Sequence, residues 1–140
     1  MAVSANKIDI RKALEAPIQD LAATLNIPAV MGGLNFDTTT AAEFLRTSIV
    51  YGKDLRPEIG VDSRLQRSGT FTVDVFTPLA NGDDYNDERC ALVRNAYPYG
   101  QDLERNGIRV NILGIDDGQC IDFRSWKFAP VDVRFIIWEA

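Results

Sequence analysis

The sequence contains no histidine among its 140 residues, and it has two cysteines and no long apolar run. Without histidine, the Ser-His-Asp and Cys-His arrangements of nucleophilic enzymes are excluded, and a metal site would have to use carboxylates and thiols alone. No segment approaches the roughly 18 consecutive apolar residues of a membrane helix. The first residues lack a basic stretch followed by an apolar one, so we expect no secretory signal and a protein of the cytosol, or one assembled there.

Motifs that hold metals or phosphate groups are also missing. The sequence has no GxxxxGK[ST] or GxGxxG segment, so a phosphate-binding loop has no support. The acidic cluster Asp83, Asp84, Asp87 and Glu88 could bind calcium, but it lacks the glycine and the distal glutamate of an EF-hand loop. Capping of a helix explains the cluster more simply. Paired carboxylates for hydrolysis stay open, because twenty acidic residues offer many pairs in space. We therefore expect no catalytic residue, no cofactor and no metal.

The two cysteines and the net charge exclude or disfavour further classes of protein. Cys90 and Cys120 form neither a CxxC pair nor a disulfide framework, which predicts two reduced, dispensable thiols, one on a helix and one near a strand. The net charge of −5 argues against free-standing nucleic-acid binding, which requires a basic face. It is compatible with DNA that passes nearby without being gripped. The length and the 46% hydrophobic content fit one globular domain over residues 1–140.

The first half of the chain predicts one helix and three strands. Apolar residues at helical spacing predict a helix over 8–25, which Pro17 should kink or split. A short strand is expected over 28–31 and another over 43–51, with four residues of the latter toward the core: Leu45, Thr47, Ile49 and Tyr51. The clearest alternation predicts a strand over 64–77, with buried Phe71, Val73 and Val75.

The second half predicts one more helix and further strands. Residues 83–96 should form a helix that Asp83 or Asp84 caps, with an inner stripe of Tyr85, Arg89, Leu92, Val93 and Ala96, in which the stem of Arg89 lies along the boundary. A strand is expected over 107–115, a turn at Asp116-Asp117-Gly118, and a last strand over 128–138 with Val131, Val133, Phe135 and Ile137 inward. This order predicts an α+β fold: a single domain with a mostly antiparallel sheet packed by two helices.

Two features point to contacts with other proteins. Residues 52–63 form a long charged segment between two strands, and connections of this length are usually functional or disordered. Its charges have both signs and could pair with a neighbouring subunit: Lys53, Asp54, Arg56, Glu58, Asp62 and, just beyond it, Arg64. Trp138 lies on the more polar face of the last strand, which favours a subunit contact. The other aromatic candidates for a ligand platform are explained by packing: Trp126, Phe128, Tyr97 and Tyr99.

The order of these features resembles the tail terminator proteins of long-tailed bacteriophages. The resemblance covers most of the chain: a first helix, the segment Met31-Gly32-Gly33-Leu34-Asn35-Phe36-Asp37, the strand from Glu43 to Val50, and the later strands. The closest local match is the run from Arg67 to Pro78, in which an arginine and a glycine precede an alternating Val-Asp-Val-Phe segment and a proline. A first helix interrupted by proline is a departure from the family pattern.

The resemblance implies a structural function. Terminators form a hexameric ring on the finished tail tube, stop its polymerisation, and present a surface for the head–tail connector, while DNA passes through the lumen without specific binding. Membranes are not involved. The expected partners are therefore copies of the chain itself, the tail tube protein and the connector, in a virion assembled in the host cytoplasm. Two alternatives are another head–tail connector or tail-completion factor of the same virion, and a cytosolic enzyme or ligand-binding domain with an unmarked site.

Overall fold

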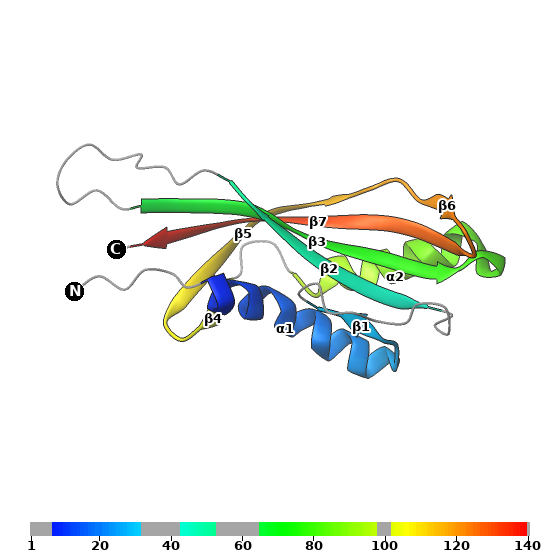
Figure 1. Cartoon of the computed structure of the whole chain (residues 1–140), viewed down its shortest axis with the longest axis horizontal. Coiled ribbons are helices and arrows are strands. Elements are labelled where there is room, and N and C mark those ends of the chain that lie inside the picture. Colours follow the sequence, from blue (N-terminus) through cyan, green and yellow to red (C-terminus); the bar gives the residue numbers. More distant parts are fainter. Residues whose placement is uncertain (1–6, 32–42, 53–64, 98–101, 140) are drawn as a thin grey trace.

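Two helices lie on one face of a seven-stranded sheet in this computed structural model, which describes residues 7–31, 43–52, 65–97 and 102–139 (Figure 1). The helices are α1 (Lys7–Leu25) and α2 (Gly82–Asn95), and a 3-10 turn, η2 (Leu79–Asn81), precedes α2. The strands are β1 (Ala29–Val30), β2 (Phe44–Tyr51), β3 (Leu65–Pro78), β4 (Asp102–Arg105), β5 (Ile108–Asp117), β6 (Ile121–Phe123) and β7 (Trp126–Glu139).

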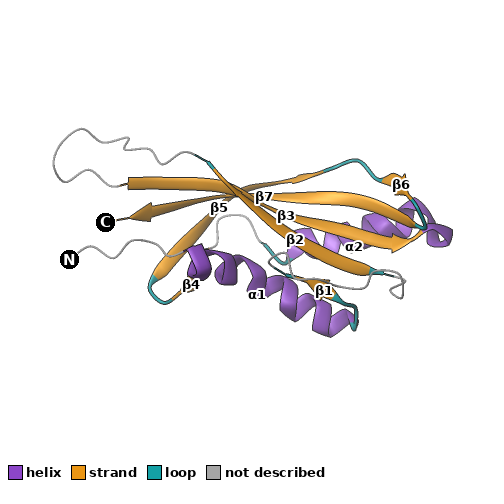
Figure 2. Ribbon diagram, in the orientation of Figure 1, coloured by secondary structure: helices purple, strands orange, loops and turns teal. Residues whose placement is uncertain are grey.

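The sheet is antiparallel except at one edge. Its strand order is β1-β2-β3-β7-β5-β4, with β6 paired to the start of β7. Only the pairing of β1 with β2 is parallel among these described strands (Figure 2). The α+β prediction, two helices on a mostly antiparallel sheet, is therefore confirmed. No helix in the described ranges is long and apolar enough to cross a membrane.

The core lies between the sheet and the two helices. Strands β3 and β7 pair along their whole length, and Phe71 lies opposite Val133 while Val73 lies opposite Val131. These four residues are buried, as the alternation predicts. Phe135 lies directly opposite Gly69, where a β-carbon would come within 2.8 Å of the Phe135 ring and 2.5 Å of the Val50 carbonyl oxygen. A glycine is therefore required at this position for the ring to lie flat over the strand.

Helix α1 continues through Pro17, so the expectation that proline splits it is wrong. Leu14 and Ile18, which flank Pro17, are fully buried against the sheet. This packing offsets the cost of proline inside a helix, about 3 kcal/mol. The helix ends where the sequence predicts, because Asn26 adopts a left-handed conformation with φ 56°.

The inner face of α2 differs from the predicted stripe. Its buried residues are Asn86, Cys90 and Val93, of which only Val93 was expected. Tyr85 lies on the flank, partly exposed, and Arg89 is partly buried at the boundary, as predicted. The cap residue is Asn81, and no side chain caps the first turn. Asp83 instead forms an ion pair with Lys127. The prediction looked for apolar residues on the buried side of the helix, but the polar side chain of Asn86 lies on that side.

The region after α2 contains a β-hairpin that the sequence analysis did not predict. Strand β4 precedes β5, and Asn106 and Gly107 join them with φ values of 52° and 81°. Consecutive residues with positive φ are typical of a tight hairpin turn. Asp116 and Asp117 are the last residues of β5, opposite Asp132 and Val131, so the turn expected there is wrong. Arg134 and Arg94 form ion pairs with these two carboxylates and help to hold them in the strand.

Candidate assembly surfaces

Most of the predicted contact residues lie outside the part of the chain that the structure describes. These are Lys53, Asp54, Arg56, Glu58, Asp62 and Arg64, with the rest of the 53–64 segment. Trp138 belongs to β7, where its backbone pairs with Gln66 of β3, and its side chain is not among those described. The interface function of all seven stays a prediction.

An aromatic cluster occupies one end of the outward sheet face, the face without helices. Phe44 and Phe76 stack with ring centroids 4.3 Å apart, and Trp126 meets Phe44 edge-on at 5.5 Å. Phe128 packs against Phe76 at 4.9 Å. Phe44, Phe76 and Trp126 are buried together with Val30. Packing, rather than a ligand platform, accounts for Trp126 and Phe128. The sequence analysis did not predict this second hydrophobic cluster.

The middle of the outward face is a band of paired charges. Arg46 forms an ion pair with Asp74 at 3.1 Å and lies over the Phe76 ring at 5.1 Å. On the next strand pair, the Thr72 hydroxyl donates to Asp132 at 2.7 Å. Burial raises the pKa of Asp74, and the hydrogen bonds from Arg46 oppose that shift. Arg46 and Asp74 thus neutralise each other within the subunit, so Arg46 is poorly suited to bind a phosphate group.

Three side chains fasten the start of β2 to the flank of α2. The Arg89 guanidinium donates to Glu43 at 2.6 Å, and the Tyr85 hydroxyl donates to the other carboxylate oxygen of Glu43 at 2.5 Å. Arg89 also donates to the Tyr85 oxygen at 2.8 Å and lies over its ring. The bond to Glu43 raises the pKa of Tyr85, because the protonated hydroxyl donates a hydrogen bond to the carboxylate that deprotonation would remove. This Glu43–Arg89–Tyr85 clamp explains why Tyr85 and Arg89 face sideways.

A buried amide and a buried phenol join the helices to the rest of the core. The Asn86 amide nitrogen lies 3.2 Å from the Val75 carbonyl oxygen, 3.0 Å from the Thr77 hydroxyl and 3.3 Å from the Lys127 carbonyl oxygen. The Tyr97 hydroxyl donates to the Leu14 carbonyl oxygen of α1. Both side chains are fully buried. These polar groups position α2 on β3 and β7 and tie it to α1.

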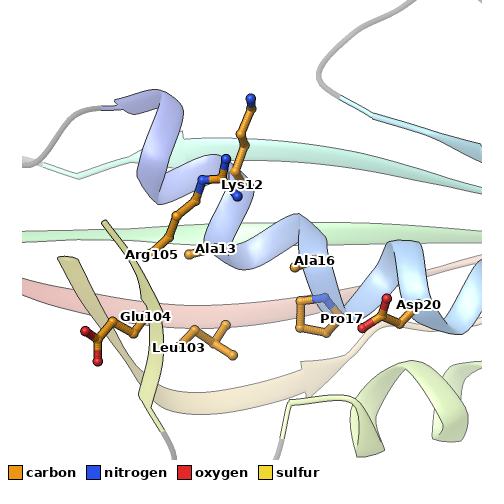
Figure 3. A pocket seen from close by; sticks show the side chains of 8 residues that line it. All are labelled: Lys12, Ala13, Ala16, Pro17, Asp20, Leu103, Glu104 and Arg105. Carbon is orange, nitrogen blue, oxygen red and sulfur yellow. The ribbon is translucent and has the colours of Figure 1, made fainter. Parts of the chain in front are cut away.

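A shallow pocket of about 270 Å³ lies between α1 and the β4 strand (Figure 3). Figure 3 shows Pro17 and Leu103 facing the same space, with Lys12 and Arg105 at one end and Asp20 at the other. The polar side chains of the lining are Lys12, Asp20, Glu104 and Arg105.

The thiols and carboxylates of the described residues show no ligand site. No three Cys, Asp or Glu side chains of these residues come together as a metal-binding group. Cys90 and Cys120 are both free, as predicted, one buried on α2 and one partly buried beside β6. Burial raises the pKa of the Cys90 thiol to about 12. The protonated thiol is a poor nucleophile, so Cys90 acts as a packing residue.

Comparisons with known proteins agree with this architecture. A family model described as phage tail terminator protein matches residues 9–135. No curated protein matches the sequence. One solved structure, of a protein whose name states no function, shares 21% identity, covers 96% of both chains and superposes with a TM-score of 0.77. A second, from the virion of a native gene transfer agent particle, shares 15% identity, covers 98% of both chains and has a TM-score of 0.57.

The two similar structures establish the fold, and the family model establishes the family to which the chain belongs. The matched residues extend from the first turns of α1 almost to the end of β7, so the match includes the sheet and both helices. The resemblance noted in the sequence is thereby confirmed. The chain belongs to the phage tail terminator family, a family of structural proteins of the phage tail.

Proposed function

We propose that the protein forms a homohexameric ring at the head-proximal end of the phage tail tube. The ring ends polymerisation of the tube protein and offers its other side to the head–tail connector. The observation that carries this proposal is the family match over residues 9–135. Assembly takes place in the host cytoplasm, and the protein is not an enzyme, has no cofactor and does not contact a membrane.

The electrostatics of the chain suit a ring through which DNA passes. A net charge of −5 per subunit is repeated six times around the proposed lumen, and this field repels phosphate groups rather than binding them. Arg46, which lies on the outward face of the sheet, is paired with Asp74. DNA would therefore slide through the ring without specific contacts.

The segment 52–63 is a proposed contact with a neighbouring subunit or with the tube, together with Arg64 and Trp138. Its charges would set register and partner choice more than affinity, because exposed pairs contribute about 0 to 1 kcal/mol each. The test is to replace Lys53 to Asp62 with a short Gly/Ser linker. Folding should survive, whereas ring formation or attachment to tails should fail. A shortened protein that still assembles and caps tails would exclude this segment as the contact.

The test of the function itself uses a phage that lacks the protein. A terminator defect leaves tubes that grow beyond their normal length, and added protein should stop this growth and appear as a ring on the tube end in electron microscopy. A connector or completion factor would differ, because its loss leaves tails of normal length without heads. Tubes of normal length in the deletion phage would therefore contradict the terminator function.

A further inference from the structure

Two exposed surfaces that contain apolar side chains lie on opposite sides of the centre of the molecule and carry charges of opposite sign. The acidic-end patch consists of Leu79, Ile121 and Phe123, with acidic residues of α2 and β6 beside them. The basic-end patch is Ile8 with the cations of the first turns of α1. Figure 1 shows β6 and the start of α2 toward the right of the view, and the first turn of α1 on the opposite side of the centre.

The acidic-end patch is held by ordered structure. Leu79, Ile121 and Phe123 are 40%, 47% and 45% exposed, and exposed apolar side chains that lie together can mark a contact surface. The Leu79 amide donates to the Ser125 carbonyl oxygen at 3.1 Å, which joins η2 to the β6–β7 hairpin. The Phe123 ring lies 6.4 Å from Phe76 of the buried aromatic cluster. The patch is thus a fixed surface that needs little ordering when a partner covers it.

Negative charge predominates around this patch. Residues 79–88 and 120–127 contain two cations, Arg124 and Lys127, against five acids: Asp83, Asp84, Asp87, Glu88 and Asp122. Lys127 is already engaged by Asp83 at 2.8 Å and by Asp122 at 2.5 Å. Arg124 lies over the Phe123 ring. The remaining carboxylates therefore present a negative rim to an incoming protein.

The basic-end patch has the complementary character. Lys7, Ile8, Arg11 and Lys12 share one face of α1, because residues three and four apart are neighbours on a helix. Ile8 is 57% exposed, and Lys12 is exposed beside it. The one acid among residues 7–12, Asp9, forms an ion pair with Arg105 at 3.7 Å. Residues 7–12 therefore carry three cations against one acid, a net charge of +2.

We infer that the acidic-end patch of one copy binds the basic-end patch of the next copy in the ring. The inference rests on the proposed ring and names its contact. Like charges oppose the pairing of two acidic-end patches or of two basic-end patches, so the contact is head-to-tail rather than two-fold. A head-to-tail contact between two different patches is the kind that closes a ring of identical subunits. Charge fixes the order of the subunits, and the apolar side chains supply the buried centre.

Charge reversals in the full-length protein test this contact. Lys12→Glu and Asp84→Lys should each raise the protein concentration needed for half assembly, by roughly fivefold or more, measured by light scattering after gel filtration. The double variant should regain assembly, because the two charges again attract. Asp20→Lys, with the same change of charge as Asp84→Lys at an exposed residue in the second half of α1, should assemble normally. No rescue in the double variant would overturn the inference.

A mixing experiment tests the head-to-tail order. Ile121→Asp blocks one patch and Ile8→Asp blocks the other, so each variant alone should be monomeric, while their mixture should give a one-to-one dimer in native mass spectrometry. Val50→Asp, at an apolar residue that is 69% exposed elsewhere on the sheet, should leave assembly intact. A ring that survives both blocking variants overturns the contact alone. A wild-type protein that stays monomeric at every concentration contradicts the proposed ring as well.

Discussion

The fully buried amide of Asn86 should be one of the most sensitive positions in the protein. Its nitrogen has two hydrogens, which three acceptors share: the Val75 carbonyl, the Thr77 hydroxyl and the Lys127 carbonyl. Asn86→Ala removes both donors and leaves the acceptors without this partner in the core. Two lost hydrogen bonds at about 1 kcal/mol each, plus the unsatisfied acceptors, predict a loss of about 2 to 4 kcal/mol in the free energy of unfolding.

Asn86→Asp should show a distinctive dependence on pH. A carboxylate at this position would face the Val75 and Lys127 carbonyl oxygens without a hydrogen to donate, so burial should raise its pKa above the unfolded value of about 3.9. A raised carboxyl pKa makes stability highest below pH 4 and lowers it as pH rises, by at most about 1.4 kcal/mol per unit. The deficit relative to wild type should therefore widen as pH rises from about 4 to the raised pKa of the folded state.

Urea unfolding measures these effects, and a midpoint that is the same at two protein concentrations shows that subunit association does not contribute. Asn95→Ala, at an exposed asparagine at the end of the same helix, is the matched control and should change stability by less than about 0.5 kcal/mol. A loss below about 1 kcal/mol for Asn86→Ala, or a pH-independent deficit for Asn86→Asp, would show that the amide does not anchor α2 in this way.

Three further sets of substitutions test the hydrophobic core, the two thiols and the Glu43–Arg89–Tyr85 clamp. Phe71→Ala should destabilise by about 3 to 5 kcal/mol through lost burial and a cavity, and wild-type thermal unfolding of this variant would contradict the strand register. Cys90→Ser and Cys120→Ser should fold with a loss of about 1 to 2 kcal/mol or less, and folded Cys90 should react slowly with a thiol reagent at pH 8, because its pKa is about 12; rapid labelling would refute its burial. Glu43→Gln and Arg89→Gln should each cost about 1 to 3 kcal/mol in chemical unfolding, and the double variant should lose less than their sum; strict additivity would indicate that the two side chains do not act together.

The central strands could be predicted from the sequence because alternation of apolar and polar residues is a local property. Phe71, Val73 and Val75 share one side of a pleated strand whatever their partners are, and so do Val133 and Phe135. The end of α1 at Asn26 followed from similarly local preferences. The family was visible for the same reason, since its pattern resides in these strands.

The structure after α2 was harder to predict, although one signal was present. Asn106-Gly107 is a favoured pair for a hairpin turn and could have revealed β4. Asp116 and Asp117 had the composition of a turn, yet they extend β5. Their strand conformation depends on pairing with β7 and on ion pairs with Arg134 and Arg94, which are distant in sequence.

The sequence by itself determined the fold class, the inner faces of the long strands and the family. Tertiary structure decided which side of α2 is buried, because Asn86 can enter the core only where β3 and β7 offer acceptors for its amide. It also decided which surface side chains lie together at each end. Leu79 and Phe123 are far apart along the chain and share a patch because η2 bonds to the β6–β7 hairpin. Periodicity records only neighbours along one element, whereas a patch depends on how the elements are packed.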